Sequence, residues 1–172
     1  GQMGNGIAHV MSLAGYDVLL NDVNEDALAQ AMARIDKNME RQVSRKKISA
    51  ENKAAAIGRI ITTSALPDLG QTDLVIEAAT EKEVVKQSIF DSLLPHLQPH
   101  TILTSNTSSI SITRLASRTD RPEKFMGFHF MNPVPVMQLV ELIRGIATDA
   151  ETFDACKKVV DKATQIAAHL LN

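Results

Sequence analysis

Apolar residues recur along this chain with two periods, one helical and one strand-like, and the two alternate. Helical spacing predicts helices over residues 4–14, 25–43, 50–58, 82–94 and 150–170. Short apolar runs predict strands over residues 17–21, 60–62, 73–77, 101–105, 125–130 and 137–143. The runs DVLLN and DLVIE have the continuous apolar character of buried parallel strands. The alternation therefore predicts an α/β fold with a mostly parallel sheet covered on both faces.

Polar residues mark where the predicted helices begin and end. Gly15 follows the first helix and can end it, because glycine adopts the left-handed conformation easily. Ser49 precedes the helix over residues 50–58, where its hydroxyl can accept an unpaired amide proton. No linker or internal repeat is visible, so we expect residues 1–172 to form one domain.

Composition excludes several classes of partner. The net charge of −2 offers no basic excess for nucleic acid, and aromatic residues make up only 3%. The short basic cluster at residues 45–47 is typical of a solvated helix end. The single cysteine, Cys156, cannot form an intrachain disulfide, and its helical context favours an inert thiol. We see neither a signal peptide nor an apolar run near 18 residues, and we expect a cytoplasmic protein without a membrane partner.

The first candidate site is the turn that opens the chain. Gly1, Met3 and Gly4 lie in GQMGNGIA, which reads as the last two glycines of a G-x-G-x-x-G loop entering a helix. Such glycines let the backbone approach a pyrophosphate at the helix N-terminus, although they can also serve helix packing alone. Asp22 ends the next predicted strand about 20 residues later, where a carboxylate binds the ribose hydroxyls of NAD and repels the 2′-phosphate of NADP. The combination favours an NAD site.

The second candidate is the polar run from Ser105 to Ser109, directly after a predicted strand. Ligands of open α/β sheets bind beyond the carboxyl ends of the strands, so Asn106 and Ser108 are placed to contact cofactor or substrate. A loop held by local hydroxyl bonds explains the same residues. Glu81 and Lys86 follow another strand; five residues apart, they are poorly spaced for a mutual ion pair on a helix surface, which leaves separate roles or exposure open.

The third candidate is a histidine and a glutamate in consecutive apolar strands. His129 and Glu141 become an imidazole–carboxylate pair if their strands are neighbours, and such a pair suits proton exchange with an alcohol or ketone. Spacing alone does not establish that pairing, and a satisfied core histidine is the other interpretation.

Four segments together resemble one known family. GQMGNGIA, AGYDVLLND, SNTSSISIT and GFHFMNPVPVMQLVELIRG are similar to the L-3-hydroxyacyl-CoA dehydrogenases, above all to bacterial members that act on 3-hydroxybutyryl-CoA. The resemblance covers residues 1 to about 166 and includes the helical pair over residues 25–58. It implies a Rossmann-type domain with that inserted pair, and NAD-dependent oxidation of (S)-3-hydroxyacyl-CoA in fatty acid or butanoate metabolism.

The resemblance also implies roles for individual residues. His129 matches the general base and Glu141 its orienting partner, whereas Ser108 and Asn132 match the groups that hold the substrate oxygen. The remaining matches are contacts to NAD or CoA. They are Asp22 on the adenosine ribose, Glu81 and Lys86 near the nicotinamide, and Arg45, Lys46 or Lys47 near the phosphates of CoA. No metal is implied.

The chain departs from the family pattern at both ends. The first strand and first glycine expected before Gly1 are absent, and residues 167–172 stand where the family continues into a helical domain that forms its dimer. Met131 replaces a common aromatic residue. Two functions therefore compete: the NAD-binding half of a homodimeric dehydrogenase acting on acyl-CoA, and a non-catalytic NAD- or CoA-binding module. An unrelated nucleotide-binding redox sensor is a third, weaker hypothesis.

Overall fold

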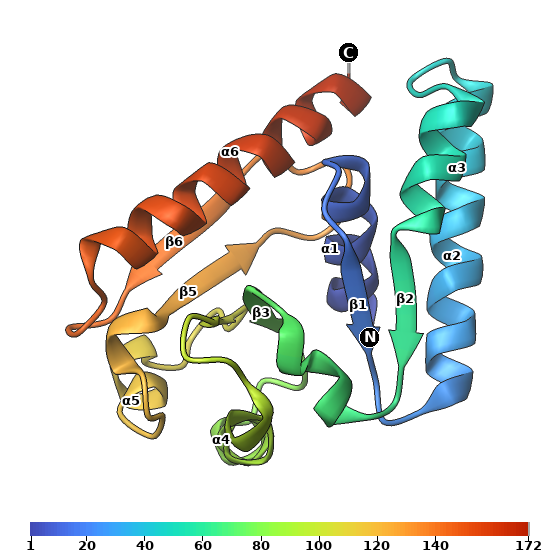
Figure 1. Cartoon of the computed structure of the whole chain (residues 1–172). Coiled ribbons are helices and arrows are strands. Elements are labelled where there is room, and N and C mark those ends of the chain that lie inside the picture. The colour runs from blue at the N-terminus through green and yellow to red at the C-terminus, as the bar shows by residue number, and fades with distance from the viewer. Residues whose placement is uncertain (172) are drawn as a thin grey trace. The chain divides into compact units, whose positions relative to one another are not determined.

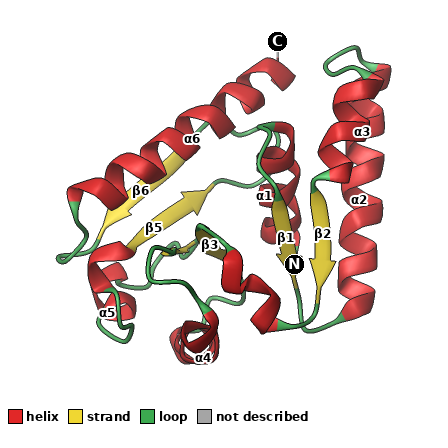
Figure 2. Ribbon diagram, viewed as in Figure 1, coloured by secondary structure: helices red, strands yellow, loops and turns green. Residues whose placement is uncertain are grey.

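The structure, a computed structural model, describes residues 1–171, and for residues 169 and 171 it describes the backbone alone. These residues fall into two compact units. Unit 1 comprises residues 1–65, 131–139 and the chain from 161 onward, and unit 2 comprises residues 66–130 and 140–160. Figures 1 and 2 show the elements of both units.

Unit 1 joins a two-stranded parallel sheet to three whole helices and the last part of a fourth. Its elements are α1 (Gln2–Leu13), β1 (Val18–Asn21), α2 (Glu25–Ser44), α3 (Ala50–Gly58) and β2 (Ile60–Thr63). β1 and β2 pair in parallel, with Val18 opposite Ile60. The helices α2 and α3 run beside each other as the predicted inserted pair (Figure 1).

Local signals position these elements as the sequence predicts. Gly15 has φ +88°, the left-handed conformation that lets the chain turn from α1 into β1. The Ser49 hydroxyl accepts a hydrogen bond from the Asn52 amide at 3.0 Å and so caps α3. Ile35 and Met39 of α2 are fully buried against Ala8 of α1 and Ala56 of α3. Their burial packs the inserted pair onto the glycine-rich helix.

Unit 2 contains a four-stranded sheet with short helices. Its strands are β3 (Leu74–Glu77), β4 (Ile102–Ser105), β5 (Phe125–Phe130) and β6 (Val140–Arg144), in the order β3-β4-β5-β6. The first three are parallel, and β6 runs antiparallel to β5. The helices are α4 (Glu83–Leu93) and α5 (Ile112–Ala116), with α6 (Ala150–Leu171) beginning in this unit and continuing into unit 1. Short 3₁₀ turns, η1 (Leu66–Gln71), η2 (Leu94–His96) and η3 (Pro122–Lys124), connect these elements.

An aromatic core holds unit 2 together. The rings of Phe90 on α4 and Phe125 on β5 meet edge to face with centroids 5.1 Å apart. Leu103 of β4 and Met126 and Phe128 of β5 are completely buried in the same unit. The core therefore fixes α4 against the middle of the sheet, with the carboxyl ends of β3 and β4 at one edge.

The α/β class, the mostly parallel strands and the inserted helical pair are confirmed. Within the described residues the hydrogen bonds divide the strands into two sheets, in which β1 and β3 each pair along one edge. Strand β6 begins three residues later than predicted, and α5 and the 3₁₀ turns were not predicted. The predicted altered tail, residues 167–172, lies partly outside the described residues. Among residues 1–171, no helix has both the length and the apolar character needed to cross a membrane.

Candidate active site

The opening turn in unit 1 has the form of a phosphate-binding helix start. Gly1 is the N-cap of α1, and neither a side-chain cap nor an acidic residue in the first turn blocks the free amide protons there. A Cβ placed on Gly1 or Gly4 would meet nothing within 4 Å, so the space beside these glycines is open. Amide protons and the helix dipole both attract anions. These residues therefore fit the pyrophosphate of a dinucleotide.

Asp22 lies beside that turn, directly after β1. Its Oδ2 is 3.5 Å from the Gly1 nitrogen, and its Oδ1 accepts a hydrogen bond from the Asn24 amide at 3.1 Å. The side chain keeps 29% of its surface exposed. Each carboxylate oxygen can accept more than one hydrogen bond, so this partly exposed side chain can also accept from a ribose hydroxyl, which fits NAD.

Residues 131–139, which follow β5 in the sequence and belong to unit 1, also contact α1. A Cβ on Gly6 would lie 3.0 Å from Cβ of Val134, so only glycine allows this approach without displacement. The Gln2 side-chain amide donates to Asn132 Oδ1 at 3.2 Å. Met3 is half-buried on the same helix. Asn132, a predicted substrate contact, therefore lies beside the first turn of the glycine-rich helix.

In unit 2, the predicted histidine–glutamate pair is present. His129 and Glu141 are direct partners in the antiparallel pairing of β5 and β6, so their side chains share one face. His129 Nδ1 lies 2.8 Å from Glu141 Oε2. The imidazole is 19% exposed and the carboxylate 51% exposed. The ring is therefore held by one nitrogen in a position that solvent or a ligand can reach, unlike a core histidine.

Glu81 organises the polar loop that follows β4. Its Oε1 accepts hydrogen bonds from the Thr107 hydroxyl at 2.5 Å, the Ser108 amide at 3.0 Å and the Ser109 amide at 3.1 Å. Burial by itself would raise the pKa of Glu81, but hydrogen bonds from the side chains of Thr107 and Ser109 and from the loop amides lower it to about 2. Glu81 is thus a fixed anion, and Ser108 stands exposed on a loop that this anion positions.

The position of Lys86 differs from the expectation that Glu81 and Lys86 form no ion pair. The spacing of Glu81 and Lys86 argues against an ion pair on a helix surface, yet Lys86 Nζ lies 3.6 Å from Glu81 Oε2. The two meet because α4 begins only at Glu83, so Glu81 belongs to the preceding loop. Lys86 is not exposed either: 1% of its side chain is accessible, and Nζ donates to both oxygens of Glu77 at 2.9 Å.

Sequence reasoning missed Glu77 as a member of this cluster. The detectable signal is an acidic residue at the end of the apolar run DLVIE, nine positions before Lys86. Asn106 Oδ1 accepts a hydrogen bond from the Phe130 amide at 2.8 Å, and its predicted contact with cofactor or substrate stays a prediction. Asn106 therefore joins the ends of β4 and β5.

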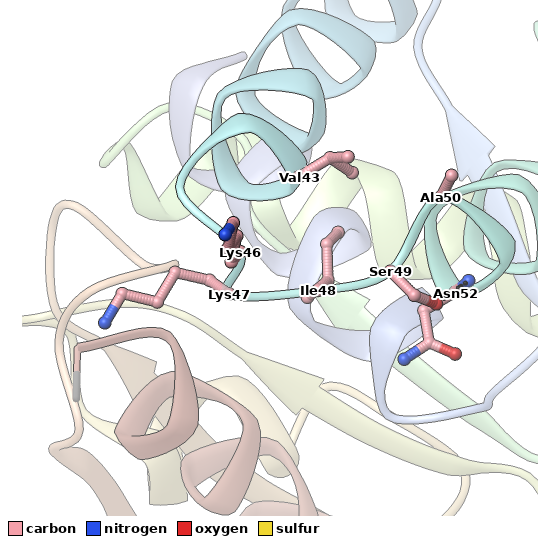
Figure 3. A pocket seen from close by; sticks show the side chains of 7 residues that line it. All are labelled: Val43, Lys46, Lys47, Ile48, Ser49, Ala50 and Asn52. Carbon is pink, nitrogen blue, oxygen red and sulfur yellow. Dashed lines mark hydrogen bonds between the residues drawn. The ribbon is translucent and has the colours of Figure 1, made fainter.

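Lys46 lies in unit 1, at the turn between α2 and α3. Lys46 and Lys47 line a shallow pocket with Ile48, Ser49 and Asn52 (Figure 3). Lys46 is exposed and has φ +58°, which turns the chain between the two helices. Within the described part of the chain, no group of three or more His, Cys, Asp or Glu side chains is arranged to hold a metal ion.

Fold and site together define a class of protein. The structure places Asp22 beside Gly1 in unit 1. In unit 2 it brings His129 to Glu141, and Glu81 to both Ser108 and Lys86. A dinucleotide-binding α/β protein with an imidazole–carboxylate pair has the parts of an oxidoreductase that acts on alcohols or ketones.

Comparison with known proteins gives the family. The family model described as "3-hydroxyacyl-CoA dehydrogenase, NAD binding domain" matches residues 1–171, and the chain belongs to this family. The match also supports NAD as the cofactor of the domain.

Individual relatives agree with that assignment. The chain is 60% identical over 162 residues to a 3-hydroxybutyryl-CoA dehydrogenase of Bradyrhizobium diazoefficiens, covering 94% of this chain and 55% of the relative. It is 44% identical to a probable 3-hydroxybutyryl-CoA dehydrogenase of Bacillus subtilis, covering 88% of this chain and 53% of that protein. The crystal structure of the (S)-3-hydroxybutyryl-CoA dehydrogenase from Ralstonia eutropha matches with a TM-score of 0.93 at 40% identity, over 95% of this chain and 58% of that one. The chain thus spans about half the length of these relatives.

Proposed function

We propose that this chain supplies the NAD-binding and proton-transfer parts of an enzyme that oxidises (S)-3-hydroxyacyl-CoA to 3-oxoacyl-CoA. The proposed substrate is short, 3-hydroxybutyryl-CoA, as in fatty acid or butanoate metabolism. The observation that carries this proposal is the 2.8 Å contact between His129 and Glu141 in a chain of this family.

The geometry of His129 suits a general base. When the Nδ1–H group donates to Glu141, the lone pair of Nε2 is free to accept the proton of the substrate hydroxyl. Glu141 holds the ring in that tautomer and stabilises the positive charge that the ring acquires. In the reverse direction the same imidazolium returns the proton to the carbonyl oxygen of a 3-oxoacyl substrate.

The other predicted residues bind and orient. NAD, when bound, accepts the hydride from the carbon that carries the hydroxyl. Gly1 and Gly4 with the start of α1 would hold its pyrophosphate and Asp22 its adenosine ribose. Ser108 and Asn132 would hold the substrate oxygen, as their match to the family implies.

The CoA part of the substrate would meet basic side chains of the helical pair. Lys46 is exposed at the turn between α2 and α3, with Lys47 beside it in the same pocket (Figure 3). Ammonium groups attract phosphates, which supports a contact with CoA at this turn. As a further partner we propose a second copy of the complete protein, because the resemblance implies a homodimer.

A second candidate is a non-catalytic module that binds NAD or CoA. The observation that favours it is that Gly1 and Asp22, the proposed dinucleotide contacts, lie together within unit 1. Such a module would keep the Gly1–Asp22 site and lack turnover.

Two measurements distinguish the two functions. The first follows the loss of NADH absorbance with acetoacetyl-CoA as substrate, and the second is a direct titration of NADH binding. Turnover supports the dehydrogenase, whereas NADH binding without turnover supports the module. Absence of both would overturn the cofactor assignment as well.

A further inference from the structure

Glu77 is a buried carboxylate at the end of β3 to which neither the family resemblance nor the proposed mechanism assigns a role. Its side chain is 2% exposed, and all its near partners are donors in unit 2. Oε1 accepts from the Ala79 amide at 2.7 Å and from Lys86 Nζ at 2.9 Å. Oε2 accepts from the Ser105 hydroxyl at 2.6 Å and again from Lys86. Glu77 thus ties the ends of β3 and β4 to α4.

The ammonium group of Lys86 lies between two carboxylates of unequal burial. It donates to both oxygens of the buried Glu77 at 2.9 Å and lies 3.6 Å from Oε2 of Glu81, whose side chain is 40% exposed. Glu77 therefore holds Lys86 tightly, and Lys86 in turn provides a fixed positive charge beside Glu81. The opposite charges attract most strongly where water is excluded.

Glu81 connects the Lys86 ammonium group to the polar loop of residues 105–109. Oε2 faces Lys86, while Oε1 accepts hydrogen bonds from the amides of Ser108 and Ser109. The two oxygens belong to one rigid carboxylate, so a movement of the ammonium group moves the acceptor of the loop amides. The continuous series from Glu77 through Lys86 and Glu81 to Ser108 is made of direct polar contacts within unit 2.

We propose that Glu77 is a positioning residue that sets the place of Ser108 through Lys86 and Glu81. The inference deepens the proposed function and rests on it for the role of Ser108 as a substrate contact. A buried ion pair that loses one partner leaves an uncompensated charge. Without the Glu77 carboxylate, Lys86 loses the two hydrogen bonds that hold its ammonium group in place, and Glu81 loses the fixed positive neighbour that positions its Oε1 toward the loop amides.

The test uses Glu77→Gln, which keeps the size of the side chain and removes its charge. Hydrogen exchange of the Ser108 and Ser109 amides, followed by NMR, should be about tenfold faster in this variant, because both amides lose a well-placed charged acceptor. Exchange of the amides that pair β5 with β6 should stay unchanged. A general loosening would accelerate both sets equally, and that result would overturn the proposal.

Glu83→Gln is the matched control. Glu83 is also a carboxylate in an ion pair at α4, with Arg114 at 2.6 Å, but it makes no contact with the series from Glu77 to Ser108 in any interaction described above. The control should leave the exchange of Ser108 and Ser109 unchanged. Unchanged exchange of these amides in Glu77→Gln would contradict the proposal directly.

A second variant covers the case in which Glu77→Gln does not fold. Glu77→Gln with Lys86→Met removes both buried charges, and such replacements are often well tolerated. This double variant should fold and still show fast exchange at Ser108 and Ser109, because Glu81 has lost its positive neighbour. Slow exchange there would show that Glu81 holds the loop without Lys86 and would overturn the inference.

Kinetics add a separate measurement. With 3-oxoacyl-CoA as substrate, Glu77→Gln should lower kcat by about tenfold and change KM less, as expected for a group that acts in the transition state. Amide exchange needs no turnover, so a protein without dehydrogenase activity still tests the positioning of the loop. Failure of the proposed function and failure of this inference are thereby distinguished. Equal loss of kcat in Glu83→Gln would count against the inference.

Discussion

The imidazole of His129 is held by Glu141, the residue directly opposite it in the β5–β6 pairing. Replacing His129 with Gln removes the base but keeps a polar side chain of similar reach. Turnover should fall by about 10²- to 10⁴-fold, the usual contribution of a general base. NADH affinity, measured by fluorescence titration, should hardly change, since His129 is not among the proposed contacts to the dinucleotide. An active variant would show that the base has been misassigned.

Asp22 tests the choice between NAD and NADP. Its carboxylate, next to the Gly1 nitrogen, would repel the 2′-phosphate of NADP. Asp22→Ser should therefore weaken NADH binding and improve NADPH binding, which narrows the ratio of their dissociation constants. Equilibrium titration with both cofactors measures that ratio, and an unchanged ratio would count against a ribose contact.

Glu81 gives the molecule a predictable response to acid. Burial alone would raise the pKa of Glu81, but the hydrogen bonds from Thr107, Ser109 and the loop amides lower it from an ordinary 4.5 to about 2. Since the folded state has the lower pKa, the carboxylate stabilises the fold fully above about pH 4.5, and this stabilisation is lost as the pH falls toward 2. Urea unfolding of the wild type and Glu81→Gln should show a larger difference in free energy at pH 7 than at pH 3. A difference independent of pH would contradict the assigned bonds.

At the scale of elements, α3 depends on a cap that can be removed. Ser49→Ala deletes the bond to the Asn52 amide and should lower the free energy of unfolding by about 1 kcal/mol. Ser92→Ala is the control, since the exposed Ser92 hydroxyl only donates to the Ser88 carbonyl within α4. Urea denaturation followed by circular dichroism measures both variants. Similar losses in the two would argue against a specific cap.

The long elements could be predicted because their signals are local. The apolar stripe of α2 and the flanking residues Gly15 and Ser49 identify helices without knowledge of the rest of the fold. Helix α5 was not predicted, because its five residues are too few to show a helical period. Its apolar residues Ile112 and Leu115 are nevertheless buried. Strand β6 begins later than its apolar run because Met137 and Leu139 stay exposed and outside the strand.

At the scale of the whole molecule, Cys156 reports opening of the fold. The thiol is buried on α6, and burial raises its pKa to about 12. Because only the thiolate reacts, native protein at pH 8 should react with Ellman's reagent roughly a thousandfold more slowly than protein unfolded in urea. Cys156 is the only cysteine in the sequence, so the signal has one source. Rapid reaction of the native protein would show that α6 detaches readily.

The sequence by itself determined the α/β class, the glycine turn followed by Asp22, and the residue types of the site. Helical periods, turn residues and motif spacings depend only on residues close together in the chain, so they can be recognised without the fold. Only the tertiary structure decided which of these residues meet. The pairing of His129 with Glu141 required the β5–β6 register, and the division of the strands into two sheets required the hydrogen bonds themselves. Burial of Lys86 on Glu77 likewise depends on how α4 packs against β3, since burial and long-range contact arise from packing between segments distant in the chain.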